Sequence, residues 1–169
     1  MKSNGPGFDY KLSNFKNVII EDRVRIFHSE NVIIGNNVYV GHDTIICGYY
    51  NSILIIHDNV WIGPQCYMHS AGGIEIQENV GIGPGVKILT SYHNLEELEK
   101  PIRLRSLIFK PVKLQKGCDI GMGAIINPGV IIGKNAQIGS GSVVTKNIPD
   151  YTIAVGNPAR VLKRRNLAK

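Results

Sequence analysis

The sequence is poor in cysteine, tryptophan and long apolar runs, and each shortage excludes a class of protein. Its 169 residues include three cysteines, one tryptophan and 7% aromatic residues. Cys47, Cys66 and Cys118 have no paired spacing such as C-x-x-C, so we expect free thiols and no disulfide framework or zinc site. The apolar runs are far too short to cross a bilayer, and no apolar stretch follows the N-terminal lysine. These absences predict a soluble, cytoplasmic protein without stable membrane insertion.

The chain is instead rich in glycine and in isoleucine and valine. Its 19 glycines and eight prolines favour many short strands joined by tight turns over helices. The 43% of apolar residues excludes a disordered chain, and the length suits one domain. The formal charge of +6 suggests an anionic partner. Because no aromatic residues interleave the basic C-terminal cluster, we expect no nucleic acid to bind there.

An aliphatic residue recurs every six positions along most of the chain. The series is clearest in its last members, which are Leu114, Ile120, Ile126, Ile132, Ile138 and Val144. Period six fits neither an α-helix nor an ordinary strand, and it predicts a three-sided coil whose stacked turns bury one another's inner face. Cys66 and Cys118 fall on inward positions of this frame and act as small apolar fillers. We interpret Cys47, in place of a usual corner residue, as structural too.

The motifs of the last coils point to one family. The strongest stretch runs from Ile120 to Gly133, and it is followed by Ile138-Gly-Ser-Gly-Ser-Val-Val-Thr-Lys146 and Val155-Gly-Asn-Pro-Ala-Arg160. With this tail the sequence resembles the hexapeptide-repeat acyltransferases, of the type that O-acetylates sugars and xenobiotics. The resemblance implies an all-β, single-domain, left-handed parallel β-helix. It also implies a homotrimer with its sites between subunits.

The repeat and the resemblance together set the expected boundaries. They are an N-terminal arm at 1–17, the β-helix domain at 18–158 and a short basic tail at 159–169. One long excursion, a protruding loop at about 94–113, interrupts the coils, and such loops in rigid solenoids are commonly functional. Asn94 and Glu97 form a capping pair at its start, which predicts one or two helical turns ended by Pro101.

His93 stands directly before this excursion, at a position that the repeat makes a corner, so its imidazole should point away from the core. Acyl transfer to a hydroxyl or an amine needs a base, and the pKa of histidine suits that role at neutral pH. The residue alone also permits an exposed histidine without function. In the family the catalytic base is a histidine in this place, and His93 matches it.

Residues near His93 are the expected acceptor contacts. They are its neighbours Tyr92 and Asn94, together with Tyr67 and His69 in the preceding coil. Related enzymes keep an asparagine near Tyr67 and His69, and its absence here indicates a different acceptor pocket.

The resemblance also assigns a binding site for coenzyme A. Basic side chains suit its phosphates. The pantetheine arm is expected along Met122 and Ser140, and the nucleotide end is expected at Thr145, Lys146, Arg160 and Lys163. The family often has Val-Trp where Cys118 and Asp119 stand, so an indole contact at that place is missing.

The expected function is direct transfer of an acetyl group from acetyl-CoA, in a ternary complex, to a sugar, nucleotide-sugar or polysaccharide precursor. A sugar-nucleotide N-acetyltransferase and an antibiotic acetyltransferase remain open, because fold and base do not separate acceptors. Two other classes are a gamma-type zinc carbonic anhydrase and a non-catalytic β-helix scaffold or binding protein. The first needs three converging histidines, and no histidine follows His93. We therefore expect no metal.

Overall fold

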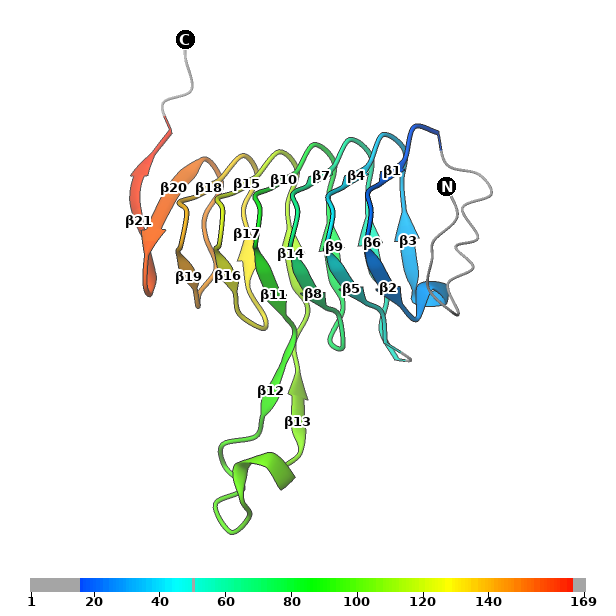
Figure 1. Ribbon diagram of the computed structural model, residues 1–169. Coiled ribbons are helices and arrows are strands. Elements are labelled where there is room, and N and C mark those ends of the chain that lie inside the picture. The colour runs from blue at the N-terminus through cyan, green and yellow to red at the C-terminus, as the bar shows by residue number, and fades with distance from the viewer. Residues whose placement is uncertain (1–15, 50, 166–169) are drawn as a thin grey trace.

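The structure, a computed structural model, describes residues 16–49 and 51–165 and has the form of a three-sided parallel β-solenoid (Figure 1). Most of the expected N-terminal arm lies outside the described residues. The predicted all-β, parallel β-helix is confirmed. No helix in the described part of the chain has the length and hydropathy needed to span a membrane.

Each turn places one short strand on each of three faces. The first face holds seven parallel strands, β1 (Ile19–Ile20), β4 (Tyr39–Val40), β7 (Trp61–Ile62), β10 (Gly81–Ile82), β15 (Asp119–Ile120), β18 (Gln137–Ile138) and β20 (Thr152–Gly156), and β21 (Ala159–Arg164) pairs antiparallel with β20. The second face holds β2 (Arg25–Phe27), β5 (Ile45–Cys47), β8 (Tyr67–His69), β11 (Lys87–Leu89), β16 (Ile125–Ile126) and β19 (Val143–Val144). The third face holds β3 (Val32–Ile34), β6 (Leu54–Ile56), β9 (Ile74–Ile76), β14 (Val112–Leu114) and β17 (Ile131–Ile132).

The period-six aliphatic residues form the core. They lie in register from coil to coil, so that Leu114 pairs with Ile132 as the repeat predicts. On the second face the inward column runs through Ile46, Met68 and Ile88, all of which are fully buried. Because each side chain packs on its counterpart in the next coil, the core is continuous along the solenoid axis.

The corners repeat as regularly as the strands. We call the turn from first to second face the first corner, that from second to third face the second corner, and that from third to first face the third corner. At the third corner each coil has a residue with positive φ, and Asn37 and Asn59 have φ of 55° and 58°. Asparagine tolerates this left-handed conformation, and here the side-chain Nδ2 of Asn37 donates to the side-chain Oδ1 of Asn59 at 3.0 Å.

The second corner is the irregular one. A 3-10 turn, η1 (Ser29–Asn31), occupies it in the first coil. In the fourth coil the chain leaves the solenoid there as a hairpin of β12 (Ser91–His93) and β13 (Leu107–Phe109), which projects from the body in Figure 1. We call residues 91–109 the hairpin. All other described strands remain on the three faces.

Candidate active site at the second corner

The hairpin differs from the loop predicted at 94–113. Its strands begin at Ser91 and end at Phe109, and β14 has rejoined the third face by Val112. The predicted helical turns after Asn94 are also wrong, since the described segment there contains turns and bends and its one helical element is the 3-10 turn η2 (Ile102–Leu104). So short a segment forms few helical hydrogen bonds to offset the cost of helix nucleation.

Polar contacts across the hairpin take the place of that helix. Glu97 accepts hydrogen bonds from the backbone N–H and the hydroxyl of Ser106 and pairs with Lys100 at 3.0 Å. These partners, the Ser106 hydroxyl first, lower the pKa of Glu97 to about 2. The Arg105 guanidinium donates to the carbonyl oxygens of Lys100 and Leu95 at 2.8 and 3.2 Å. The tip is therefore held by side-chain bonds rather than by a core.

His93 ends β12 opposite Leu107 and is half-buried. The repeat predicted a corner of the coil for His93. That prediction is wrong, because the chain has already left the solenoid in β12. The Nδ1 atom of His93 lies 3.3 Å from the Arg105 carbonyl oxygen. A carbonyl oxygen can only accept, so this contact requires a proton on Nδ1 and leaves the lone pair on Nε2 in neutral imidazole. His93 is thus held in the tautomer that can take a proton at Nε2.

Buried hydroxyl groups fasten the hairpin base to the preceding coil. Thr90 is fully buried, and its hydroxyl donates to the His69 carbonyl oxygen at 2.6 Å and accepts from the Gly72 N–H at 2.8 Å. The Lys110 N–H donates to the Thr90 carbonyl oxygen at 2.9 Å on the return path. A Cβ at Gly72 would lie 2.5 Å from the Thr90 carbonyl oxygen, so a side chain at position 72 would displace the base of the hairpin.

His69 lies on the second face and is the register partner of Leu89. Leu89 precedes the start of β12 by two residues. The Nε2 atom of His69 shares a 2.6 Å hydrogen bond with the Tyr49 hydroxyl, and the Tyr67 ring lies 6.4 Å away, centroid to centroid. Its Nδ1 is buried, without a hydrogen-bond partner in the described part of the chain. Burial lowers the pKa of His69, which keeps the ring neutral near neutral pH.

The three cysteines are free thiols. Burial raises the pKa of Cys66 to about 11 and that of Cys118 to about 12, so neither is a nucleophile at neutral pH. Cys47 ends β5 and pairs with His69 across the sheet, so it is a strand residue and not the predicted corner residue. Burial raises the pKa of its thiol as well.

The residues predicted for coenzyme A lie in the last three coils, on different elements. Met122 and Ser140 are exposed at the first corner of successive coils, where the Gly141 N–H donates to the Met122 carbonyl oxygen at 2.8 Å. Thr145 and Lys146 are exposed at the second corner, after β19. Arg160 and Lys163 are exposed on β21, so part of the expected tail is a strand of the first face.

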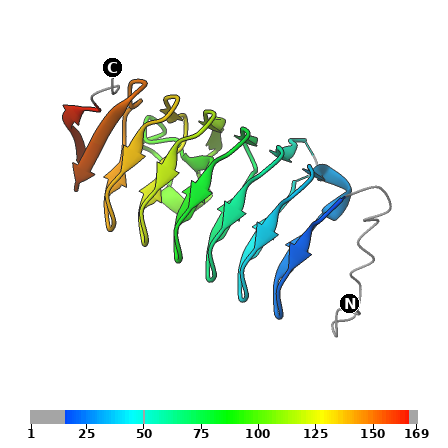
Figure 2. The same ribbon diagram turned by 90° about the horizontal axis from the view of Figure 1, so that it is seen from above.

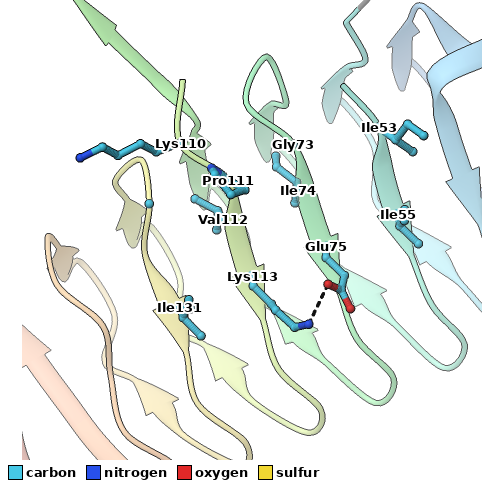
Figure 3. A pocket seen from close by; sticks show the side chains of 11 residues that line it. Ile53, Ile55, Gly73, Ile74, Glu75, Lys110, Pro111, Val112, Lys113 and Ile131 are labelled. Carbon is cyan, nitrogen blue, oxygen red and sulfur yellow. Dashed lines mark ion pairs between the residues drawn. The ribbon is translucent and has the colours of Figure 1, made fainter. Parts of the chain in front are cut away.

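A groove of about 520 Å³ borders the hairpin base on the third face (Figure 3). Ile53, Ile55 and Ile131 line it, and Glu75 and Lys113 form an ion pair of 2.8 Å beside them. Lys110 and Pro111 lead the chain back from the hairpin at its rim, and Lys110 extends away from the groove. No residue predicted for the site from the sequence lines this groove.

Tyr92, His93 and Asn94 are consecutive residues near the hairpin base. The residues predicted to bind coenzyme A are spread over two corners and β21. Sequence reasoning missed Thr90 and Arg105. Thr90 carries a signal, because a polar residue at an inward position before an irregular corner must find a partner. The role of Arg105 comes from its backbone oxygen, which no residue type reveals. Among the described residues, no group of three or more histidine, cysteine, aspartate or glutamate side chains could hold a metal ion.

The stacked six-residue frame and the strongest stretch of the chain define the class of protein. Residues 111–146 match the family model described as bacterial transferase hexapeptide (six repeats). The structure is similar to a maltose O-acetyltransferase from Clostridium difficile 630, with a TM-score of 0.63 and 33% identity over 91% of this chain and 70% of that chain. The chain belongs to the hexapeptide-repeat transferase family.

Other relatives are named for acylation of different acceptor atoms, an oxygen in one and a nitrogen in another. The galactoside O-acetyltransferase of Escherichia coli K12 is 31% identical over 89% of this chain and 63% of its own length. A mutant N-acyltransferase from Bacillus cereus, solved with dTDP-4-amino-4,6-dideoxyglucose and coenzyme A, matches with a TM-score of 0.81 and 25% identity over 90% of this chain and 83% of that chain. The chain spans 45 to 63% of the length of the first curated relatives that it matches.

Proposed function

We propose that this protein is an acetyl-CoA-dependent acetyltransferase whose general base is His93. The observation that carries the proposal is the contact of its Nδ1 with the Arg105 carbonyl oxygen, which leaves Nε2 able to accept a proton. The two hydrogen bonds of the Thr90 hydroxyl, to Gly72 and His69, hold the base of the hairpin that carries this imidazole. Thr145 and Lys146, candidates for the donor's nucleotide end, occupy the same corner two coils further on.

The reaction is a direct transfer in a ternary complex. Nε2 of His93 takes the proton of the acceptor hydroxyl or amine as that atom attacks the thioester carbon, and a tetrahedral oxyanion forms. The C–S bond then breaks, the acetyl group remains on the acceptor, and the imidazolium returns the proton to the thiolate. Backbone N–H groups of a glycine-rich corner in a neighbouring subunit of a homotrimer would stabilise the oxyanion. No acyl-enzyme is needed, because burial keeps the Cys66 and Cys118 thiols protonated.

The acceptor is a sugar or a nucleotide-linked sugar. The relatives named above support this class, since they include a galactoside O-acetyltransferase and an N-acyltransferase solved with an amino sugar nucleotide. Tyr92 and Asn94 beside the base, with His69 and Tyr67 on the second face, are the proposed acceptor contacts. The His69–Tyr49 pair fixes one polar edge of that region.

Calorimetry of acetyl-CoA binding, followed by thiol release with a panel of acceptors, tests the proposal. The panel is a galactoside, maltose, glucosamine and a dTDP-linked amino sugar. Binding of the donor with release of free thiol on at least one acceptor is expected. Failure to bind acetyl-CoA would overturn the donor assignment and favour a scaffold or binding protein instead.

A further inference from the structure

An exposed aromatic pair on the first face adjoins a residue that has no side chain. Tyr39, Trp61, Gly81 and Asp119 are register partners on successive strands, β4, β7, β10 and β15, which Figure 2 shows from above. The Tyr39 and Trp61 rings are stacked, with centroids 5.7 Å apart and planes 3° from parallel. Trp61 nevertheless remains 45% exposed.

Trp61 stacks on Tyr39 on one side, and its register partner on the other side, Gly81, has no side chain to cover the second face of the indole. Tyr39 covers Trp61 from the second coil, so the uncovered face points toward Gly81 and the fourth coil. Parallel strands lie about 4.8 Å apart, so the Trp61 and Asp119 backbones are separated by about 10 Å across the glycine. The Asp119 carboxylate leans over Gly81 and takes up part of that separation, so a ring against the indole lies at the outer edge of the sheet.

A carboxylate forms the floor of this slot. Asp119 is exposed, and its Oδ1 lies 2.7 Å from the position that a Cβ of residue 81 would occupy. Among the described residues, its other oxygen accepts a single long hydrogen bond, of 3.5 Å, from Gln137 Nε2. Within residues 16–49 and 51–165, Asp119 takes part in no ion pair. A carboxylate without an ion-pair partner attracts a cation by its charge, and the neighbouring aromatic ring attracts it through its quadrupole.

We propose that the slot between Trp61 and Asp119 binds a protonated amino sugar. The apolar face of its pyranose ring packs on the free face of the indole, and its ammonium group donates to the Asp119 carboxylate. A neutral sugar could make the stacking contact but not the ionic one, so the slot distinguishes the two. The slot lies on the first face, whereas the hairpin leaves from the second corner. The inference is therefore independent of the proposed acetyl transfer.

The sole tryptophan of the chain makes the slot directly observable, because Trp61 reports its own occupation by fluorescence. The protein is titrated without acetyl-CoA with glucosamine, glucose and N-acetylglucosamine, at a pH that keeps the amine protonated. Glucosamine is expected to change the emission and to bind about 5-fold more tightly than either neutral sugar, as expected for about 1 kcal/mol of exposed cation attraction.

Two variants and a control complete the test. Asp119→Asn should lower the affinity for glucosamine to that for glucose, while Asp22→Asn, an exposed carboxylate at the first corner of the first coil, should leave the preference unchanged. Gly81→Ala should weaken all three sugars, because its methyl group would lie beside the slot, 2.7 Å from Asp119 Oδ1, and force the carboxylate to move. Equal affinity for glucosamine and glucose in the wild type, or no emission change with any sugar, would overturn the proposal.

Discussion

The solenoid body and the hairpin are stabilised in opposite ways. In the body, aliphatic side chains in register bury one another in a continuous core, and successive coils repeat these contacts. The hairpin has no such core, and Leu95, Leu98 and Leu104 are more than half exposed in it. Bonds at Glu97, Ser106 and Arg105 hold the hairpin instead. The repeat thus supplies stability, and the one long departure from it supplies the candidate base.

Matched truncations in the two regions should give the largest difference in stability. Ile88→Ala removes a fully buried side chain of the second face and should lower the free energy of unfolding by about 2–5 kcal/mol, because the rigid coil cannot close the cavity. Leu98→Ala, at 77% exposure in the hairpin, should change it by less than about 0.5 kcal/mol. Urea unfolding measures both, and similar losses would contradict the difference between the regions.

The base of the hairpin joins the two regions, and a second matched pair sharpens the comparison there. Thr90→Val leaves the Gly72 N–H without its partner and should cost about 1–3 kcal/mol of stability and reduce turnover. Thr44→Val removes equivalent buried bonds, to the Gly63 carbonyl oxygen and the Cys66 N–H, far along the chain from the hairpin.

Thermal unfolding and thiol release separate the two threonine variants. Both should lose stability, but only the change at Thr90 should impair acetyl transfer. Equal loss of turnover in both would show that the hydroxyl at Thr90 has no special part in positioning His93.

Acid should loosen the hairpin before the body, and this is the smallest expected effect. The pKa of Glu97 lies at about 2 in the folded chain, below its ordinary value of 4.5, so its bonds stabilise the hairpin fully above pH 4.5. That contribution is lost as the pH falls from 4.5 toward 2, when the carboxylate takes up a proton.

The Ser106 amide resonance reports this change, because its N–H donates to Glu97. We expect it to shift in the wild type over that pH range and to be constant in Glu97→Gln, whereas Glu99→Gln should titrate like the wild type. A Ser106 resonance unaffected by acid in the wild type would exclude the Glu97 contact.

The difference between the repeating solenoid body and the non-repeating hairpin also explains which features could be predicted from the sequence. Leu114 and Ile132 were assigned to the core correctly, because period six follows from packing and every coil repeats it. The hairpin was located but misjudged in its limits and in the helix after Asn94, because Glu97 bonds to Ser106, nine residues away, as well as to its close neighbour Lys100. Such contacts depend on the hairpin's three-dimensional path, for which the chain offers no repeating pattern.

Replacement of His93 tests the central claim most directly. His93→Ala and the control His42→Ala, an exposed histidine at the first corner, should bind acetyl-CoA like the wild type in calorimetry. With the acceptor identified by the panel, His93→Ala should lose about 100-fold or more in kcat, the usual contribution of a general base, and His42→Ala should lose nothing. A His93→Ala enzyme within a fewfold of the wild-type kcat would contradict the account.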